Sequence, residues 1–276
     1  MGSLKDVLDG REGEGTEPER MGRADETGRR MREYASDESG REPGVDVYTW
    51  RDGPLDGRTS AFESFVAGKA PESGQRIVYV DGGFDLFSSG QIEFLRSVIR
   101  IEEDKARSND WYKDAARSER VKATGEDYGP CYVVAGIHDD AEINRHKGLN
   151  YPIMNIFERG LCLLQCRYVH SVIFGAPFEP TEAFLRNLPA GSGRLPSIVY
   201  HGPTSFMPLS YDPYVEAKRL GIFEEIPRHD FQEVDAGHIV DRITKSRARF
   251  EERQRAKGVK AVGEVATRER ELKSQA

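Results

Sequence analysis

The feature that most constrains this chain is a run of β-branched residues that ends in a glycine turn and leads straight into a helix. The run RIVYVDG, residues 76–82, is typical of a buried strand. After the turn GGFDLFSSG, Ile92, Leu95 and Val98 follow at helical spacing in QIEFLRSVIRIEEDKA. A strand, a turn and a helix in this order form the first half of a βαβ crossover, which predicts a parallel sheet.

The same alternation continues along the chain. The runs CYVVAGIH, SVIFGAP and SIVYHGP each read as a further strand, and YPIMNIFERGLCLLQCRYV reads as a helix before the second of them. A charged insert from Asp104 to Gly129 is expected to be a surface loop. We therefore predict an α/β domain with a mostly parallel sheet, whose ligands bind at the carboxyl ends of the strands.

Composition sets the expected domain limits. Hydrophobic residues make up 37% and charged residues 32% of the 276 residues, so part of the chain is expected to stay solvated. Residues 1–75 are predicted to be a mostly disordered linker or tail, although the clusters VYTW and FESFV could dock on a neighbouring surface. The folded domain is expected over 76–257, with a helical tail over 258–276. Ile239, Ile243 and Phe250 lie on one face of the helix that precedes this tail.

Charge, hydropathy and cysteine usage argue against a nucleic-acid binder, a membrane-spanning protein and a metal-binding protein. A net charge of −7 argues against a general nucleic-acid binder. The sequence has no apolar run of about 20 residues and no signal-peptide core, so we expect a cytoplasmic protein without an integral membrane segment. Its three cysteines sit in apolar surroundings and are expected to be buried thiols. Cys162 and Cys166 lack the further ligands of a zinc set, so no metal site is expected.

A series of longer motifs carries a family resemblance. VDGGFDLF, AGIHDDAEINRHKGLNYPIMNIFERGLCLLQCRYV, GAPF, HGPT, DPYVEAKRLGIFEEI and IVDRI follow one another in order. On these motifs, residues 76–257 resemble the cytidylyltransferases, most closely the C-terminal copy of the nucleotidyltransferase domain in the ethanolamine-phosphate cytidylyltransferases. The resemblance implies a Rossmann-like fold and transfer of a cytidylyl group from CTP, bound with Mg²⁺, to phosphoethanolamine. The products would be CDP-ethanolamine, for phosphatidylethanolamine synthesis, and pyrophosphate.

The chain departs from the family where the chemistry is most demanding. The family's His-x-Gly-His element reads Ser88-Ser89-Gly90-Gln91 here, so both histidines are absent. Serine and glutamine can still donate hydrogen bonds, but neither carries charge. Loss of one preorganised donor costs about 10² to 10³ in rate, so Ser88 and Gln91 predict a weak or inactive copy.

A second element is also replaced. The family's segment rich in Arg, Thr and Ser aligns with residues 230–237, where Asp230, Glu233 and Asp235 stand instead. Carboxylates repel the triphosphate that an arginine would clamp.

Other family positions are retained. By resemblance, the nucleotide-binding candidates are Gly82, Gly83, Phe84, Lys147, Arg167 and His201, and the substrate-side candidates are Asp85 and Phe178. Each has a plainer explanation: Lys147 can be a solvated lysine, Arg167 can pair locally, and Phe178 can be core rather than a cation–π partner. The pattern of Asn155, Glu158 and Arg159 fits structural ion pairing as readily as substrate contact.

Three hypotheses for function follow. The first is the C-terminal half of a CTP:phosphoethanolamine cytidylyltransferase with degenerate catalytic motifs, in which case the chain is either part of a longer two-domain enzyme or the product of an incomplete gene model. The second is a non-catalytic regulatory or scaffolding nucleotide-binding module, which partners an active cytidylyltransferase domain or forms a homodimer. The third is a transferase with altered chemistry, in which Arg145, His146 or His229 supply the missing cations. Convergence of Lys147, Arg167 and His201 on one site would favour retained binding.

Overall fold

The computed structural model describes residues 17–37, 44–50, 62–148, 150–202, 211–258 and 260. Its strands are β1 (Asp46–Trp50), β2 (Phe62–Val66), β3 (Arg76–Gly82), β4 (Cys131–Ile137), β5 (Ser171–Phe174), β6 (Ile198–His201) and β7 (Phe223–Glu225). Its helices are α2 (Glu17–Tyr34), α3 (Ser89–Ser108), α4 (Asp114–Thr124), α5 (Asp140–Lys147), α6 (Ile156–Leu164), α7 (Glu182–Arg186), α8 (Val215–Arg219) and α9 (Ala236–Lys245), with a short 3-10 helix at Pro189–Gly191. The chain divides into two compact units, residues 1–235 and 236–276.

The first unit is built on one seven-stranded sheet with the order β2-β1-β5-β4-β3-β6-β7. Every neighbouring pair is parallel except β1 and β2, which are antiparallel. The α/β class with a mostly parallel, Rossmann-like sheet is therefore confirmed. From β3 the chain adds β4 and β5 on one side and then crosses to add β6 and β7 on the other, so the order reverses between β3 and β6.

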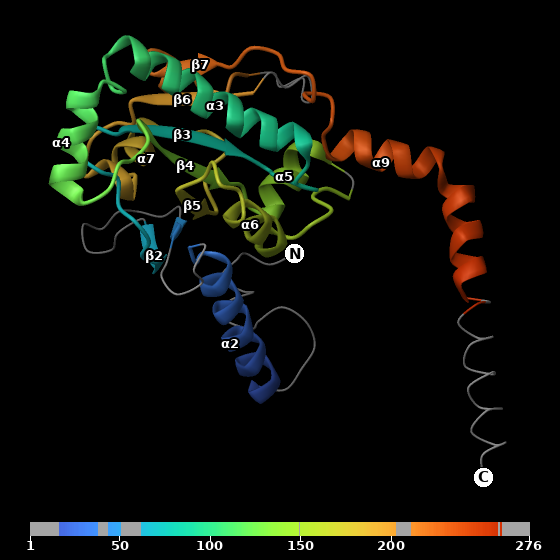
Figure 1. Cartoon of the computed structure of the whole chain (residues 1–276). Coiled ribbons are helices and arrows are strands. Elements are labelled where there is room, and N and C mark those ends of the chain that lie inside the picture. The colour runs from blue at the N-terminus through green and yellow to red at the C-terminus, as the bar shows by residue number, and fades with distance from the viewer. Residues whose placement is uncertain are drawn as a thin grey trace, which may run out of the picture. The chain divides into compact units, whose positions relative to one another are not determined.

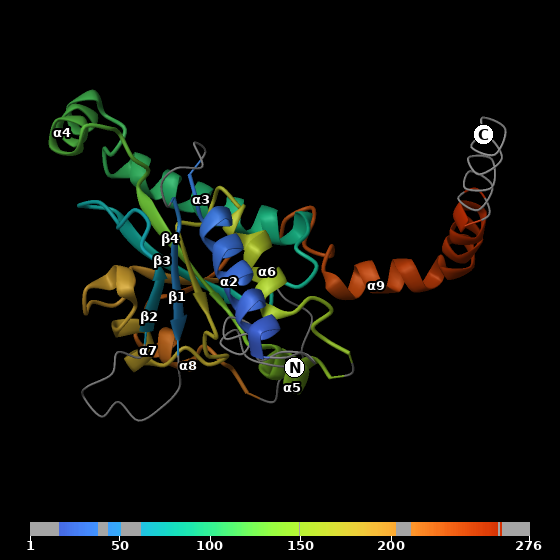
Figure 2. The same ribbon diagram turned by 90° about the horizontal axis from the view of Figure 1, so that it is seen from below.

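Alternating side chains of the strands enter two separate cores. Val78 and Val80 pack with residues of α2, α3 and α6, whereas Tyr79 packs with residues of α7 and α8. Figures 1 and 2 show α2, α3 and α6 on one side of the sheet and α7 and α8 on the other. This two-faced burial explains why the strands read as nearly continuous apolar runs.

The expectation of a mostly disordered linker over residues 1–75 is wrong for the stretches that the structure describes. β1 pairs with β5, and β2 extends the sheet beyond it. Met31 and Ala35 at the end of α2 are fully buried in the core formed with α3 and α6. The few apolar residues of this segment therefore complete the edge of the domain, which does not begin at residue 76.

Two other expectations need correction. The insert from Asp104 to Gly129 is largely helical: α3 continues to Ser108 and α4 follows. Arg120 organises it, because its guanidinium donates to Asp127 and to the Trp111 carbonyl and lies 4.4 Å from the centre of the Trp111 ring.

The end of the domain also differs from the expected position at residue 257, because the first unit ends at Asp235. The second unit begins with α9, and the chain is helical again from residue 247 to 258. Ile243 and Phe250, two members of the expected apolar face, are 50% and 39% exposed. The predicted tail over 258–276 lies almost wholly outside the described residues. No helix within the described ranges is long and apolar enough to cross a membrane.

Candidate functional site

The candidate site lies at the carboxyl edge of the sheet, where the strand order reverses between β3 and β6. In open α/β sheets this switch point is where ligands bind. β3 ends in the turn that carries the predicted glycines, and β6 ends at His201. The fold thus brings the turn after β3 and the end of β6 to one edge, as expected from the sequence.

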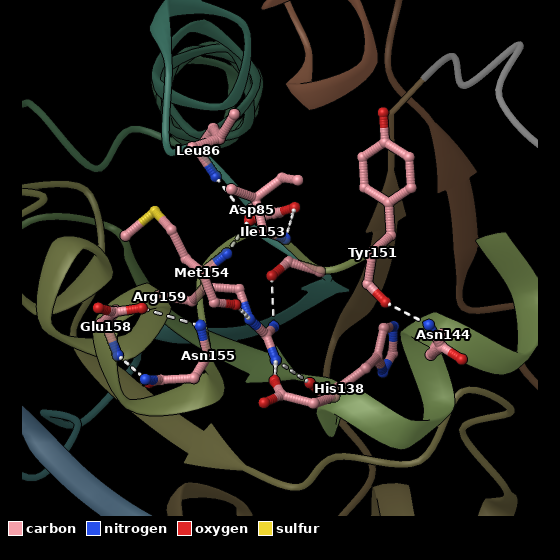
Figure 3. A network of polar contacts seen from close by, with 12 residues as sticks. Asp85, Leu86, His138, Asn144, Tyr151, Ile153, Met154, Asn155, Glu158 and Arg159 are labelled. Carbon is pink, nitrogen blue, oxygen red and sulfur yellow. Dashed lines mark hydrogen bonds and ion pairs between the residues drawn. The ribbon is translucent and has the colours of Figure 1, made fainter. Parts of the chain in front are cut away.

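Asp85 holds the turn after β3 in place. Its carboxylate accepts hydrogen bonds from the backbone amides of Leu86 (3.0 Å), Ile153 (2.8 Å) and Met154 (2.9 Å), as Figure 3 shows. Its neighbours Phe84 and Leu86 have positive φ angles of 49° and 45°, which non-glycine residues rarely adopt. The carboxylate is buried and stabilises this conformation. Its predicted contact with substrate stays a prediction.

Arg159 forms hydrogen bonds with several loops at this edge. Its buried guanidinium donates to the carbonyl of Gly83, to the carbonyl of His138 at 2.8 Å and to the Asp140 carboxylate at 2.6 Å. Figure 3 shows it reaching from α6 into this network. All of these partners belong to the protein, so the arginine serves as a structural ion pair and hydrogen-bond donor.

Asn155 and Glu158 begin α6. The Asn155 side chain accepts from the Glu158 amide, and the Glu158 carboxylate accepts from the Asn155 amide, both at 2.9 Å. This reciprocal pair is a capping box, which satisfies amides at the start of a helix. The contacts of Asn155, Glu158 and Arg159 within the chain therefore support the structural explanation of this pattern.

Ser88 and Gln91, the two predicted degenerate positions, contact each other. The Gln91 side-chain oxygen accepts from the Ser88 backbone amide at 2.8 Å and from the Ser88 hydroxyl. The Gln91 amide nitrogen donates to the Asp85 carbonyl at 3.2 Å, and the Ser88 hydroxyl is 2.6 Å from the Val234 carbonyl. Both side chains thus stabilise the start of α3 and its contact with the segment before α9.

The segment 229–235 packs closely on the first turn of α3. A Cβ atom on Gly90 would lie 2.5 Å from the Val234 carbonyl oxygen and 2.9 Å from that of Phe231, so only glycine fits here. The acidic segment predicted to face the ligand is therefore at the start of α3, beside Ser88 and Gln91.

Lys147, a predicted nucleotide-binding residue, is half-buried at the end of α5. Its ammonium lies 5.5 Å from the centre of the Tyr151 ring. Burial lowers the pKa of Lys147, while the nearby carboxylates of Asp85 and Asp235 act to raise it. Asp235, in the acidic segment 230–237, thus acts electrostatically on this lysine.

His201 lies at the end of β6 with its ring 4.7 Å from the ring of Tyr214. Burial lowers the pKa of His201, which favours the neutral imidazole. Tyr214 in turn donates a hydrogen bond of 2.5 Å to Asp81, the carboxylate near the end of β3. The two strands that flank the switch point are thus linked through one tyrosine.

Asp81 is the residue that sequence reasoning missed. It is 6% exposed, and its second oxygen, Oδ2, is buried without a hydrogen-bond partner among the described residues. Burial raises the pKa of Asp81 to about 7, and the hydrogen bond from Tyr214 opposes this rise. A carboxylate at the end of a buried strand, in YVDG, is the sequence signal that could have identified it.

Phe178 is stacked on a histidine. Its ring lies 3.8 Å from that of His146 at an interplanar angle of 17°, and 5.3 Å from the ring of His138. His146 also contacts the Glu142 carboxylate at 2.9 Å, and Arg145 pairs with the same carboxylate at 3.1 Å. Of the predicted replacement cations, these two therefore have acidic partners on α5.

Arg167 does not join the other candidates. It is exposed and precedes β5, so it lies at the amino edge of the parallel sheet, opposite Lys147 and His201. Its guanidinium lies 5.7 Å from the centre of the Tyr168 ring. Arg167 therefore does not converge with Lys147 and His201 on one site, which is the arrangement that would have favoured retained binding.

Comparison with known proteins supplies the family. No family model matches the chain. An ethanolamine-phosphate cytidylyltransferase from Mus musculus is 38% identical over 210 residues, which are 75% of this chain and 44% of the relative. One from Dictyostelium discoideum is 32% identical over 207 residues, 74% of this chain and 48% of the relative. One from Arabidopsis thaliana is 29% identical over 70% of this chain and 38% of the relative.

The chain is related to the ethanolamine-phosphate cytidylyltransferases. The resemblance expected from the motifs is therefore confirmed. The chain spans about half the length of the curated relatives that it matches, or less.

Proposed function

We propose that this chain forms a cytidylyltransferase lobe of phosphatidylethanolamine synthesis that binds ligand but transfers the cytidylyl group weakly or not at all by itself. In the full reaction, a phosphate oxygen of phosphoethanolamine attacks the α-phosphorus of CTP, and the bond to the leaving pyrophosphate breaks. The observation that carries the proposal is the mutual engagement of Ser88 and Gln91 at the start of α3. Neither residue supplies the cation that the developing charge requires.

The charge at this edge supports the same conclusion. Positive groups must meet the triphosphate, but Arg159 is buried among protein partners, and Lys147 is influenced by two carboxylates. Mg²⁺ would arrive with the CTP phosphates, because no group of three or more His, Cys, Asp or Glu side chains among the described residues is arranged to hold a metal ion.

The other side of the edge carries an anion that suits the substrate. The Asp81 carboxylate has one buried oxygen, Oδ2, and its Oδ1 accepts from Tyr214, whose ring lies 4.7 Å from that of His201. A carboxylate beside an aromatic ring suits an ammonium group, through charge and cation–π attraction. We assign the ammonium end of phosphoethanolamine to this group. Because the cation requires the ionised carboxylate, its binding should strengthen as pH rises through 7, near the pKa of Asp81.

A second candidate function is a nucleotide-binding regulatory or scaffolding module. The chain spans 44% of the mouse relative, which leaves room for a catalytic domain in a longer protein or for a separate partner copy. A regulatory or scaffolding role requires an intact fold, but it does not require the cations that stabilise the triphosphate during transfer. The two functions differ in turnover and in whether an active cytidylyltransferase domain must be present.

The test is a calorimetric titration of the whole chain with CTP and Mg²⁺, and separately with phosphoethanolamine. Pyrophosphate release is then followed with both ligands present. We expect binding of at least one ligand and turnover far below about 1 s⁻¹, a rate ordinary for enzymes. Turnover at or above that rate would refute the loss of transfer, and absence of binding by both ligands would refute the ligand-binding role.

A variant pair tests the substrate side. Part of the pH dependence of phosphoethanolamine binding comes from titration of the ligand itself. The remaining pH dependence should be absent in Asp81→Asn. Asp230→Asn changes an exposed carboxylate of the same unit and should leave that dependence as it is. Equal pH profiles in the wild-type chain and in Asp81→Asn would contradict the assignment of the ammonium group.

A further inference from the structure

A buried carboxylate on α3 connects this helix to the strands of the candidate site. Glu102 is 0% exposed, and it accepts hydrogen bonds from the Tyr200 hydroxyl at 2.7 Å and from the Arg76 guanidinium at 2.5 Å. The Lys105 ammonium donates to the same tyrosine oxygen at 2.6 Å and to the Glu224 carboxylate at 2.8 Å. Side chains of α3 are thus bonded to residues of β3, β6 and β7.

This network lies beside the site residues along both strands of the switch point. Tyr200 pairs in register with Val80 of β3 on one side and with Glu224 of β7 on the other. Asp81 follows Val80 directly, and His201 follows Tyr200. The carboxylate and the histidine of the candidate site are therefore each one residue beyond this register pair.

Tyr200 and His201 point to opposite faces of the sheet, because successive side chains of a strand alternate between its faces. Tyr200 packs in the core on the α3 side. The ring of His201 lies 4.7 Å from that of Tyr214, which belongs to the core on the α8 side. The network therefore holds β6 from one face, while the side chains of the candidate site lie on the other.

Burial makes the position of β6 against α3 strict. Tyr200, like Glu102, is 0% exposed, so water cannot replace a lost partner of either side chain. A shift of β6 would take the tyrosine hydroxyl away from a buried carboxylate, and a buried charge that loses a donor is strongly unfavourable. The hydroxyl of Tyr200 thus favours one position of the strand end.

We infer that Tyr200 is a positioning residue: its hydroxyl, held between Glu102 and Lys105, sets the position of His201 at the end of β6. This inference rests on the proposed function, which assigns the ammonium of phosphoethanolamine to the carboxylate of Asp81. The ring of His201 contacts that of Tyr214, the hydrogen-bond partner of this carboxylate. Tyr200 is too buried to touch the ligand, so its effect on binding passes through the strand end.

The test compares two tyrosine-to-phenylalanine variants by calorimetric titration with phosphoethanolamine, well below their unfolding transitions. Tyr200→Phe should bind about tenfold more weakly than the wild-type chain. Tyr132→Phe is the matched control, because it also removes a hydroxyl that donates to a buried carboxylate, that of Asp46. Tyr132 is near the start of β4, at the amino edge of the sheet, so its loss should change affinity less than about twofold.

A second variant covers the case in which Tyr200→Phe does not fold. Lys105→Met removes the ammonium from the tyrosine oxygen but keeps the hydrogen bond between Tyr200 and Glu102. Its side chain is 36% exposed, so the substitution is expected to be tolerated. It should weaken phosphoethanolamine binding by about threefold. Unchanged affinity in both network variants would overturn the inference, as would an equal loss in Tyr132→Phe.

A ligand-free measurement tests the positioning by itself. The imidazole signals of His201 in an NMR spectrum should shift in Tyr200→Phe and stay in place in Tyr132→Phe. Unchanged His201 signals in Tyr200→Phe would overturn the inference whether or not any ligand binds. Failure of the proposed function is a separate result, since it requires the wild-type chain to bind neither CTP nor phosphoethanolamine.

Discussion

Replacing Asp81 with asparagine should remove a large pH dependence from the free energy of unfolding. Burial raises the pKa of Asp81 to about 7 from its ordinary value of 3.8. The folded protein therefore binds a proton between these values that the unfolded chain has released. Stability is greatest below pH 4 on this account and falls as pH rises toward 7. Asparagine cannot ionise, but its side-chain oxygen can still accept the hydrogen bond of the Tyr214 hydroxyl.

The size of the effect follows from the two pKa values of Asp81. Between pH 5.5 and 8.0, the wild-type chain should lose about 2 kcal/mol of stability through this carboxyl group, relative to Asp81→Asn. Urea unfolding of both proteins at the two pH values measures the difference between their free energies of unfolding. Groups that titrate alike in the two proteins contribute equally to both, so their effects cancel in this difference. Asp230→Asn, at an exposed carboxylate, provides the control. A difference between Asp81→Asn and the wild-type chain that stays constant within about 0.5 kcal/mol would refute the reasoning.

Three further predictions concern the packing of the same edge. Gly90→Ala should destabilise the chain by about 1–3 kcal/mol in urea unfolding, because its methyl group would overlap the Val234 carbonyl, whereas Gly129→Ala, in open space, should be nearly neutral. Asp85→Asn should cost about 1–3 kcal/mol and speed hydrogen exchange at the Ile153 amide, since the asparagine oxygen can still accept from Leu86 and Met154 whereas Ile153 loses its acceptor. Burial lowers the pKa of His138 to about 4, so the wild-type chain should lose up to about 3 kcal/mol as pH falls from 6.5 to 4. Asn in place of His138 should abolish that loss, and an unchanged acid profile would contradict it.

Local pattern was sufficient to predict the centre of the sheet. The strands at 76–82 and 131–137 are buried on both faces and therefore read as continuous apolar runs. The capping residues at Asn155 and Glu158 also stand at their expected spacing. Such features depend on residues close together in the chain.

The N-terminal elements were missed because their order depends on distant partners. Val47 is fully buried, but only because β1 lies beside β5, more than a hundred residues away in the chain. Met31 is likewise buried against a core that belongs to later helices. In isolation this segment has too few apolar residues to repay the entropy of ordering, so its composition resembles that of a linker.

The candidate site divides in the same way between sequence and tertiary structure. The sequence by itself predicted the family resemblance, the turn after β3, and the uncharged residues Ser88 and Gln91 at the start of α3. Tertiary structure decided which charges meet: it joined Asp81 to Tyr214 across 133 positions and left Arg167 at the opposite edge. The physical reason is that motifs identify residues by spacing along the chain, whereas burial and electrostatic interaction depend on distance in space.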